Sequence, residues 1–181
     1  KVSILIPNMD HRQDLQRAVE SIYGKSTYSN FEILVLENNS VQEETFSYYE
    51  QLEKEHGNLR VIKWEESFNY AAINNFGVRH AQGEYLLFLN NDIEIITPEW
   101  MEEMLGYCQR EDVGVCGAKL LYPNDRIQHA GVVIGLGGPA GHVLCGAKNH
   151  VLSYAGKSNS TQDLSAVTAA CMMTPKDVFE K

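Results

Sequence analysis

Residues 68–95 read FNYAAINNFGVRHAQGEYLLFLNNDIEI, and they combine a helix, a tight turn, a strand and a polar strand end. Tyr70 to Ala81 has the pattern of a helix, with Asn69 as a plausible N-cap and Gly83 beyond its end. Tyr85 to Leu89 is a short apolar run, typical of a strand covered on both faces. This succession predicts a layered α/β fold in which the strand is central.

The same alternation extends to both sides of this stretch. The expected strands are Val2–Ile6, Phe31–Leu36 and Leu59–Trp64, and the expected helices are Asp14–Tyr23, Glu43–His56 and a helix that opens at Thr97-Pro98-Glu99 and runs to about Cys108. Strictly alternating strands and helices predict a parallel sheet with right-handed crossovers and helices on both faces.

The pattern changes after Val113. A stretch rich in Gly, Ser and Asn, Gly135 to Gln162, predicts a long loop, and Ala166–Thr174 predicts one more strand. A helix then begins, with Thr174 as its cap and Pro175 at its first position. We expect residues 1–181 to be a single domain that is cut from a longer polypeptide at its C-terminal side.

Composition limits the classes of function. The 181 residues contain 24 acidic and 15 basic side chains and carry a net charge of −9, which disfavours nonspecific nucleic-acid binding. No run approaches the roughly 20 apolar residues that span a bilayer. The four cysteines form no C-x-x-C pair, so we expect reduced and mostly buried thiols in a cytoplasmic protein.

Polar residues gather at the ends of the expected strands. The four strand ends are residues 7–10, 37–40, 65–69 and 90–92. In a parallel sheet these ends share one edge, where ligands bind in the crevice outside the carboxyl ends. The alternative is that such loops are polar anyway and that Asn or Asp only caps the next helix.

Asn90-Asn91-Asp92 offers one carboxylate with amide oxygens beside it. Such hard oxygen ligands suit Mg²⁺ or Mn²⁺, which complete their coordination with water and a diphosphate. A single carboxylate makes a weak site, so we expect metal to bind together with a nucleotide.

Several other functions fail on spacing. No G-x-x-x-x-G-K-[ST] or G-x-S-x-G motif occurs. Residues 135–140, GLGGPA, mimic a dinucleotide fingerprint but precede no amphipathic helix and lie far from the first strand. His129, His142 and His150 lack a metal-binding spacing, and isolated histidines are more often structural.

The chain resembles the nucleotide-sugar-binding half of a family 2 glycosyltransferase of GT-A fold. The resemblance rests on VSILIPNMD, FEILVLENNS, residues 68–95, QHAGV and AACMMTPKDVF. It implies a Rossmann-like three-layer sandwich with a mostly parallel central sheet. Asn-Asn-Asp with a downstream Gln-His-Ala-Gly is similar to the branch that contains rhamnosyltransferase-like surface-polysaccharide enzymes, in which a deoxyhexose donor is possible.

The resemblance also implies roles for individual residues. Pro7 and Met9 would line the base pocket, Glu37 would contact uracil or ribose, Asn69 and Asn74 would face the nucleotide, Asn91 would meet the ribose or diphosphate, and Asp92 would hold Mg²⁺ or Mn²⁺. We also expect His129 near the sugar, with His142. Asn90 and Asn91 replace usual aspartates, and Glu37 stands where Asp is commoner.

The implied reaction is an inverting displacement, in which an acceptor hydroxyl attacks the anomeric carbon of a nucleoside-diphosphate sugar and a carboxylate base takes its proton. The acceptor would be a saccharide or a lipid-linked molecule, which allows peripheral membrane association of the full-length protein. The base is expected beyond Lys181. A noncatalytic nucleotide-binding module and a nucleotidyltransferase are the alternatives, and the donor sugar, nucleobase, acceptor and oligomeric state stay open.

Overall fold

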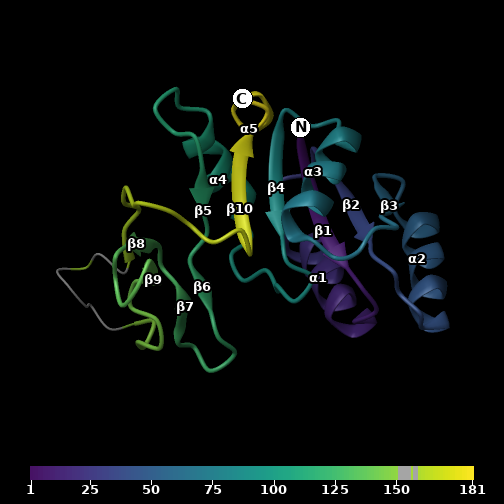
Figure 1. Cartoon of the computed structure of the whole chain (residues 1–181), viewed down its shortest axis with the longest axis horizontal. Coiled ribbons are helices and arrows are strands. Elements are labelled where there is room, and N and C mark those ends of the chain that lie inside the picture. Colours follow the sequence, from purple (N-terminus) through teal and green to yellow (C-terminus); the bar gives the residue numbers. More distant parts are fainter. Residues whose placement is uncertain (151–155, 157–158) are drawn as a thin grey trace.

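A six-stranded sheet forms the centre of the protein. The computed structural model describes residues 1–150, 156 and 159–181. The strand order is β3-β2-β1-β4-β10-β5 (Figure 1). These strands are β1 (Val2–Asn8), β2 (Phe31–Glu37), β3 (Leu59–Lys63), β4 (Tyr85–Leu89), β5 (Cys116–Gly117) and β10 (Cys171–Pro175). β1 to β4 pair in parallel, whereas β10 pairs antiparallel with both β4 and β5. The predicted mostly parallel sheet is confirmed.

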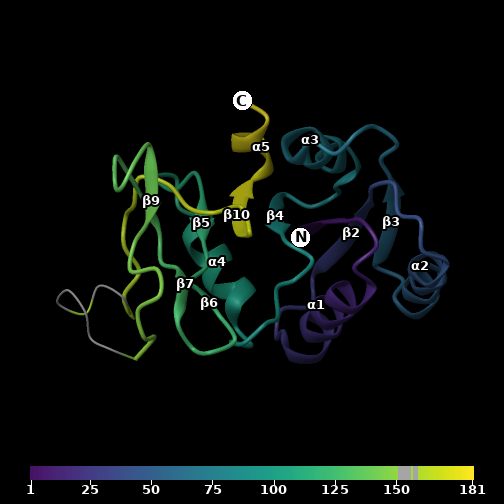
Figure 2. The ribbon, with the colours of Figure 1, turned by 60° about the horizontal axis from the view of Figure 1, so that its bottom comes forward.

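Helices cover both faces of this sheet, as predicted (Figure 2). The helices are α1 (Arg12–Lys25), α2 (Glu43–Glu55), α3 (Tyr70–His80), α4 (Trp100–Cys108) and α5 (Lys176–Phe179). Ile4 and Ile6 of β1 share a core with α1, α2 and α4, whereas Leu5 shares the opposite core with α3. This alternation along β1 is the two-residue period of a strand that is buried on both faces.

One glycine of α3, Gly77, lies directly against the sheet. A Cβ atom on Gly77 would lie 2.6 Å from Leu36 Cδ1 and 2.7 Å from Leu5 Cδ2. A larger residue at position 77 would therefore push α3 away from β1 and β2. The close approach fixes the first turn of α3, with Tyr70, at the edge of the sheet where β1 and β4 end.

The predicted starts of the last two helices, α4 and α5, are wrong. α4 begins at Trp100 rather than at Thr97, because residues 97–99 form a turn in which the Trp100 amide donates to the Thr97 carbonyl at 3.3 Å. Thr174 does not cap the last helix. It is the buried fourth residue of β10, and its hydroxyl donates to the Gly114 carbonyl at 2.8 Å, while Pro175 stands at the N-cap.

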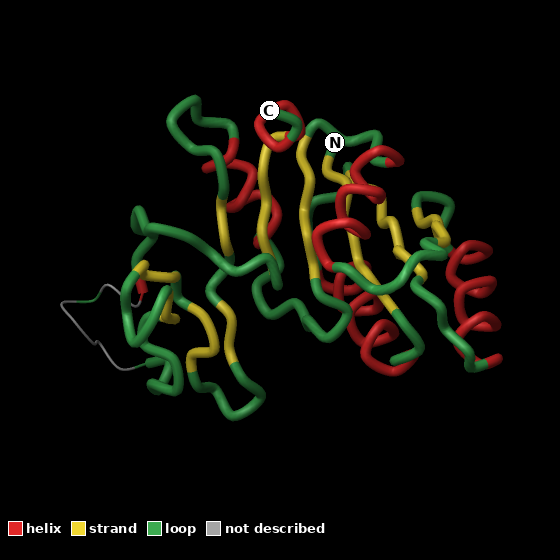
Figure 3. The backbone as a smooth tube through the Cα atoms, in the orientation of Figure 1, coloured by secondary structure: helices red, strands yellow, loops and turns green. Residues whose placement is uncertain are grey.

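The chain between β5 and β10 forms a second region built on two small hairpins (Figure 3). β6 (Leu120–Leu121) pairs with β7 (Ile127–His129), and β8 (Val132–Ile134) pairs with β9 (Ala140–His142). The long loop expected from Gly135 to Gln162 is thus wrong in part, since β9 lies inside it; residues 151–155 and 157–158 lie outside the described residues. β10 begins at Cys171, so the expected strand from Ala166 is also too long.

The glycine-rich stretch at 135–140 is the connection between β8 and β9. Gly135, Gly137 and Gly138 all have positive φ, and the Gly135 amide donates to the Pro139 carbonyl at 3.0 Å. No helix begins there, as the sequence indicated. These glycines serve a hairpin turn that other residues would strain.

All four cysteines are free: Cys108 and Cys171 are buried, Cys116 is half-buried and Cys145 is exposed. The expectation of mostly buried thiols therefore holds for two of them. In the described part of the chain, every helix is too short or too polar to cross a bilayer.

Candidate nucleotide-binding site

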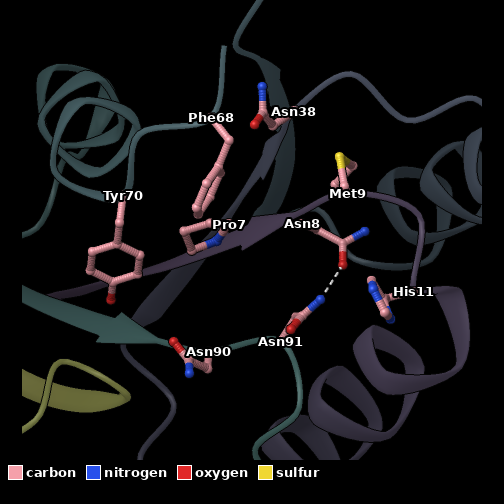
Figure 4. A pocket seen from close by; sticks show the side chains of 9 residues that line it. All are labelled: Pro7, Asn8, Met9, His11, Asn38, Phe68, Tyr70, Asn90 and Asn91. Atoms are coloured by element: carbon pink, nitrogen blue, oxygen red, sulfur yellow. Dashed lines mark hydrogen bonds between the residues drawn. The ribbon is translucent and has the colours of Figure 1, made fainter. Parts of the chain in front are cut away.

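A pocket of about 320 Å³ lies at the carboxyl ends of β1, β2 and β4, beside the first turn of α3 (Figure 4). Its lining residues are Pro7, Asn8, Met9, His11, Asn38, Phe68, Tyr70, Asn90 and Asn91. Each of the four predicted strand ends contributes at least one of them. The predicted crevice at one edge of the sheet is present, and its size is in the range of small-molecule sites.

Large apolar side chains form one wall of the pocket. Met9 is 48% exposed and Phe68 is 63% exposed. Figure 4 shows the ring of Phe68 directed toward Pro7, with Tyr70 on the same side of the pocket. Aromatic and sulfur-containing side chains left open in a concave site offer flat apolar contacts to a planar ligand.

Amide side chains form the floor. Asn91 Nδ2 donates to Asn8 Oδ1 at 2.7 Å, and the backbone amide of Asn90 donates to the Ala170 carbonyl at 3.0 Å. The Tyr70 hydroxyl donates to the neighbouring Ala169 carbonyl at 3.0 Å. The floor and the aromatic wall are therefore both attached to the segment that leads into β10.

Glu37 lies behind this floor and does not line the pocket. It is 2% exposed, and its carboxylate accepts hydrogen bonds from Tyr49 Oη at 2.6 Å, Ser40 Oγ at 2.5 Å and the Ser40 amide at 2.6 Å. Burial, and then the hydrogen bond to Glu37, raise the pKa of Tyr49, so its hydroxyl keeps its proton. The structure gives Glu37 internal partners, and direct contact with a base or ribose stays a prediction.

The loop after β1 has a strained backbone. Asp10 and His11 both have positive φ, 54° and 44°. The Asp10 carboxylate accepts hydrogen bonds from the Val41 and Gln42 amides at 3.1 and 3.0 Å, which ties the loop to the start of α2. Left-handed backbone at non-glycine residues costs about 1–2 kcal/mol and is concentrated at functional sites.

Asn38 brings an unpaired acceptor to the pocket. Its Nδ2 donates to the Glu66 carbonyl at 2.9 Å and to the Trp64 carbonyl at 3.3 Å. Its Oδ1 has no hydrogen-bond partner among the described residues, although the residue is 99% buried. A buried carbonyl oxygen without a partner is costly, so this atom suits a ligand that donates a hydrogen bond.

Asn69 and Asn74, which were predicted to face the nucleotide, stabilise the first turn of α3. Asn69 Oδ1 accepts from the Ala72 amide at 3.0 Å, the predicted N-cap. Asn74 is buried, and its Nδ2 donates to the Tyr70 carbonyl at 2.8 Å. Neither lines the pocket; both hold the first turn of α3, which carries Tyr70.

Asp92, the predicted metal ligand, follows Asn91 in an exposed turn. Within the described residues, no group of three or more His, Cys, Asp or Glu side chains could hold a metal ion. The donors at this turn are the Asp92 carboxylate and the amide oxygens of Asn90 and Asn91. This oxygen-only set fits Mg²⁺ or Mn²⁺ when a ligand's own oxygens complete the coordination.

His129 and His142 lie in the second region rather than in the pocket lining. Their Nδ1 atoms are 2.9 Å apart, and His129 Nε2 accepts from the Thr168 amide at 3.4 Å. Burial, and then the charge of His142, lower the pKa of His129 to about 4, so this ring is neutral near pH 7. Thr168 precedes Ala169 and Ala170, the residues bonded to Tyr70 and Asn90.

Three of the predicted site residues, Pro7, Met9 and Asn91, line the pocket. Asn38, Phe68 and Tyr70 also line the pocket, although no site role was predicted for them. Asn38 and Phe68 belong to the predicted polar strand ends, so the position of each at a strand end was the available signal. Tyr70 was assigned only to the helix start.

Comparisons with known proteins agree with this geometry. The chain matches glycosyl transferase family 2 over residues 3–181. The O-antigen biosynthesis protein RfbC of Myxococcus xanthus is 41% identical over 99% of the chain. The chain spans only 14% of that relative and 20% of another curated relative that it matches over 99% of its own length.

Solved structures share the fold. The mannosyltransferase PcManGT from Pyrobaculum calidifontis, in complex with GDP-Man and Mn²⁺, has a TM-score of 0.60 at 20% identity, covering 68% of this chain and 36% of that one. S. aureus TarS in complex with UDP-GlcNAc has a TM-score of 0.59 at 22% identity, covering 70% and 36%. By its sequence match and its fold, this chain belongs to glycosyl transferase family 2.

Proposed function

We propose that this domain binds a nucleoside-diphosphate sugar in the pocket at the sheet edge and transfers the sugar, with inversion, to a hydroxyl group of a saccharide or lipid-linked acceptor. The observation that carries the proposal is an apolar wall facing an amide floor at the carboxyl ends of β1, β2 and β4, in a chain of family 2. The sugar-nucleotide complexes of PcManGT and TarS support this choice of ligand.

The nucleobase occupies the apolar side in this proposal. Met9 and Phe68 offer exposed apolar surface to a planar ring, and Pro7 lies beside them. The unpaired Asn38 Oδ1 accepts a hydrogen bond from a base N–H or a ribose hydroxyl. Binding of such a group relieves the cost of burying that oxygen without a partner.

The diphosphate lies over the amide floor. Asp92, with the amide oxygen of Asn91 beside it, would hold Mg²⁺ or Mn²⁺ together with the donor, and the Mn²⁺ in PcManGT supports a divalent cation here. When bound, the cation stabilises negative charge on the leaving diphosphate. Because the protein supplies one carboxylate, nucleotide and metal are expected to bind cooperatively.

The second region faces the acceptor in this proposal. We place the His129–His142 pair toward the sugar, because Thr168, bonded to His129, adjoins the residues bonded to Tyr70 and Asn90. A neutral imidazole there positions sugar hydroxyls. The resemblance puts the base that takes the acceptor's proton beyond Lys181, and we assign that role to no residue of this chain.

We propose a role in polysaccharide or glycoconjugate synthesis in the cytoplasm. The relation to an O-antigen biosynthesis protein supports the pathway class. Four cysteines in the free thiol state are typical of a reducing compartment. A lipid-linked acceptor would bring the full-length protein to a membrane surface.

Calorimetry with UDP, GDP and dTDP, each with and without Mn²⁺, tests donor binding. At least one nucleotide should bind, and Mn²⁺ should tighten it. Phe68→Ala should weaken binding about tenfold through loss of stacking, and Asp92→Asn should remove most of the Mn²⁺ effect. Tyr122→Ala, at an exposed aromatic residue of the second region, is the matched control. A chain that binds none of these nucleotides contradicts the proposal.

A transfer assay with the full-length natural protein separates an enzyme from a noncatalytic binding module. Sugar transfer or donor hydrolysis that is lost in Asp92→Asn supports the enzyme. Nucleotide binding without either reaction, across an acceptor screen, supports the module.

A further inference from the structure

We propose that Asn8 is a positioning residue that turns the side-chain amide of Asn91 so that its oxygen, and not its nitrogen, faces the cation of the bound donor, with the direction set by the buried pair Tyr49 and Glu37. The inference rests on the proposed function, because it concerns the same pocket. It gives Glu37 a role at a distance from the ligand.

The donor and acceptor roles in this series of hydrogen bonds are set at Glu37. Three donors converge on its two carboxylate oxygens, and one of them, the Ser40 amide, can only donate. Ser40 Oγ itself receives the Asp10 amide at 2.8 Å, so its own proton goes to Glu37. The proton of Tyr49 is likewise directed at Glu37. The tyrosine oxygen is left as an acceptor.

Asn8 takes its orientation from that acceptor. Its Nδ2 donates to Tyr49 Oη at 2.7 Å and also to the Asp10 carbonyl at 2.8 Å. Both partners accept, so turning the amide over would place Oδ1 against two oxygens. Asn8 is 97% buried, and no water can replace these bonds cheaply. Asn8 Oδ1 therefore points to Asn91.

Asn91 must then donate, and it does so through Nδ2 at 2.7 Å. Figure 4 shows its oxygen on the side turned away from Asn8. Among the described residues, no hydrogen bond to Asn91 Oδ1 is formed. The relay of hydrogen bonds from Glu37 through Tyr49 and Asn8 to Asn91 thus leaves Asn91 Oδ1 available beside Asp92. A neutral amide oxygen is the ligand atom that an amide can offer to a hard divalent cation.

This relay predicts an unusual response to a carboxylate at position 91. Aspartate would add charge for the cation, but it would also place an oxygen 2.7 Å from Asn8 Oδ1, where no proton is available. The repulsion should outweigh the added charge while Asn8 is held. When the Asn8 side chain is removed, the variant with aspartate at position 91 should bind the nucleotide and cation as well as or better than the one with asparagine.

A double-mutant cycle measures this coupling. The ligand is whichever of UDP, GDP and dTDP binds the parent protein best, titrated by calorimetry with and without Mn²⁺. Asn91→Asp should weaken Mn²⁺-dependent binding roughly tenfold in the parent. In the Asn8→Ala background the same change should leave affinity equal or increase it. Without Mn²⁺ the reversal should disappear, because no cation is left to gain from the carboxylate.

Tyr49→Phe is a milder test of the coupling, because it removes the hydroxyl and keeps the ring in the core. It leaves Asn8 held by the Asp10 carbonyl alone, so the Asn91→Asp penalty should shrink several-fold. Tyr48→Phe is the matched control, since Tyr48 is a buried neighbour whose hydroxyl has no hydrogen bond in the described chain. It should leave the penalty unchanged.

The outcomes separate the two proposals. A parent that binds no nucleotide overturns the donor site and this inference with it. Nucleotide binding with the same Asn91→Asp effect in every background overturns the relay alone, and so does a reversal that persists without Mn²⁺. A ligand-free readout exists as well: in the parent's NMR spectrum the Asn91 side-chain NH₂ should be protected from exchange, and Asn8→Ala should remove that protection.

Discussion

The first 110 residues and the segment between β5 and β10 differ in what holds them in place. Almost the whole buried apolar core belongs to the former and to β10; between residues 111 and 170, only Leu120 and Ile127 belong to it among the described residues. All six glycines with positive φ lie in the second segment. The pocket lining comes entirely from the first. The pocket is thus built on the part held by burial, while the second region is shaped by turns.

The largest expected effect on the free energy of unfolding comes from a matched pair of Leu→Ala substitutions, one in each region. Leu34→Ala in β2 should cost about 3–4 kcal/mol of the free energy of unfolding, because its cavity lies in the middle of the sheet. Leu120→Ala in β6 should cost about 1–2 kcal/mol, because the small hairpin can adjust around it. Urea unfolding measures both, and equal losses would contradict the distinction.

Acid should affect the second region first. The folded state holds the pKa of His129 at about 4, below the ordinary 6.5, so an unfolded chain binds more protons between these values. Stability from this group is complete above about pH 6.5 and is lost as pH falls toward 4, by about 3 kcal/mol. Hydrogen exchange of residues 127–143 against pH measures the loss. His129→Gln should abolish this dependence; an unchanged profile would contradict it.

The first region should resist acid down to a lower pH. Burial alone would raise the pKa of Glu32, but hydrogen bonds from Ser3, the Gln82 amide and Arg60, with the charge of Lys1, bring it below 4.5. A depressed carboxylate contributes stability above its unfolded pKa that is lost as pH falls through the folded one. Glu32→Gln should cost about 1–2 kcal/mol at pH 7 and flatten the unfolding profile below pH 4.5. Glu111→Gln, at an exposed carboxylate that forms no ion pair with the described residues, should do neither.

The smallest effect concerns the contact between the two regions. Tyr70→Phe keeps the ring and removes the hydrogen bond to the Ala169 carbonyl, so the free energy of unfolding should fall by about 1 kcal/mol or less. Exchange of the amides at 168–170 should accelerate, while amides in β1 and β2 stay protected. Unchanged exchange at 168–170 would show that Tyr70 does not anchor this segment.

The same contrast explains what could be predicted from sequence. The strand Tyr85–Leu89 was predicted to the residue, because an apolar run between a Gly-bearing turn and polar residues indicates a buried strand with clear ends. β9 was predicted to be part of a loop, since Ala140–His142 has no strand pattern of its own and pairs with Val132–Ile134. Thr174 was misassigned because its partner, Gly114, is 60 residues away.

The site was predictable in position more than in detail. Parallel topology put the strand ends together, and this placed Pro7, Met9 and Asn91 in one pocket. It could not show that the Glu37 side chain turns inward to Tyr49, because a strand's last residue can face either side of the sheet. That choice depends on α2, whose packing no local pattern reveals.

The placement of β10 also has a cost during synthesis. β4 ends at Leu89, and its partner strand starts at Cys171, so the ribosome must add about 80 residues before that side of β4 is paired. At roughly 5–20 residues per second, a nascent chain would present an apolar, unpaired strand edge for about 4–16 s. Chaperone access in that interval would then govern the yield of active molecules.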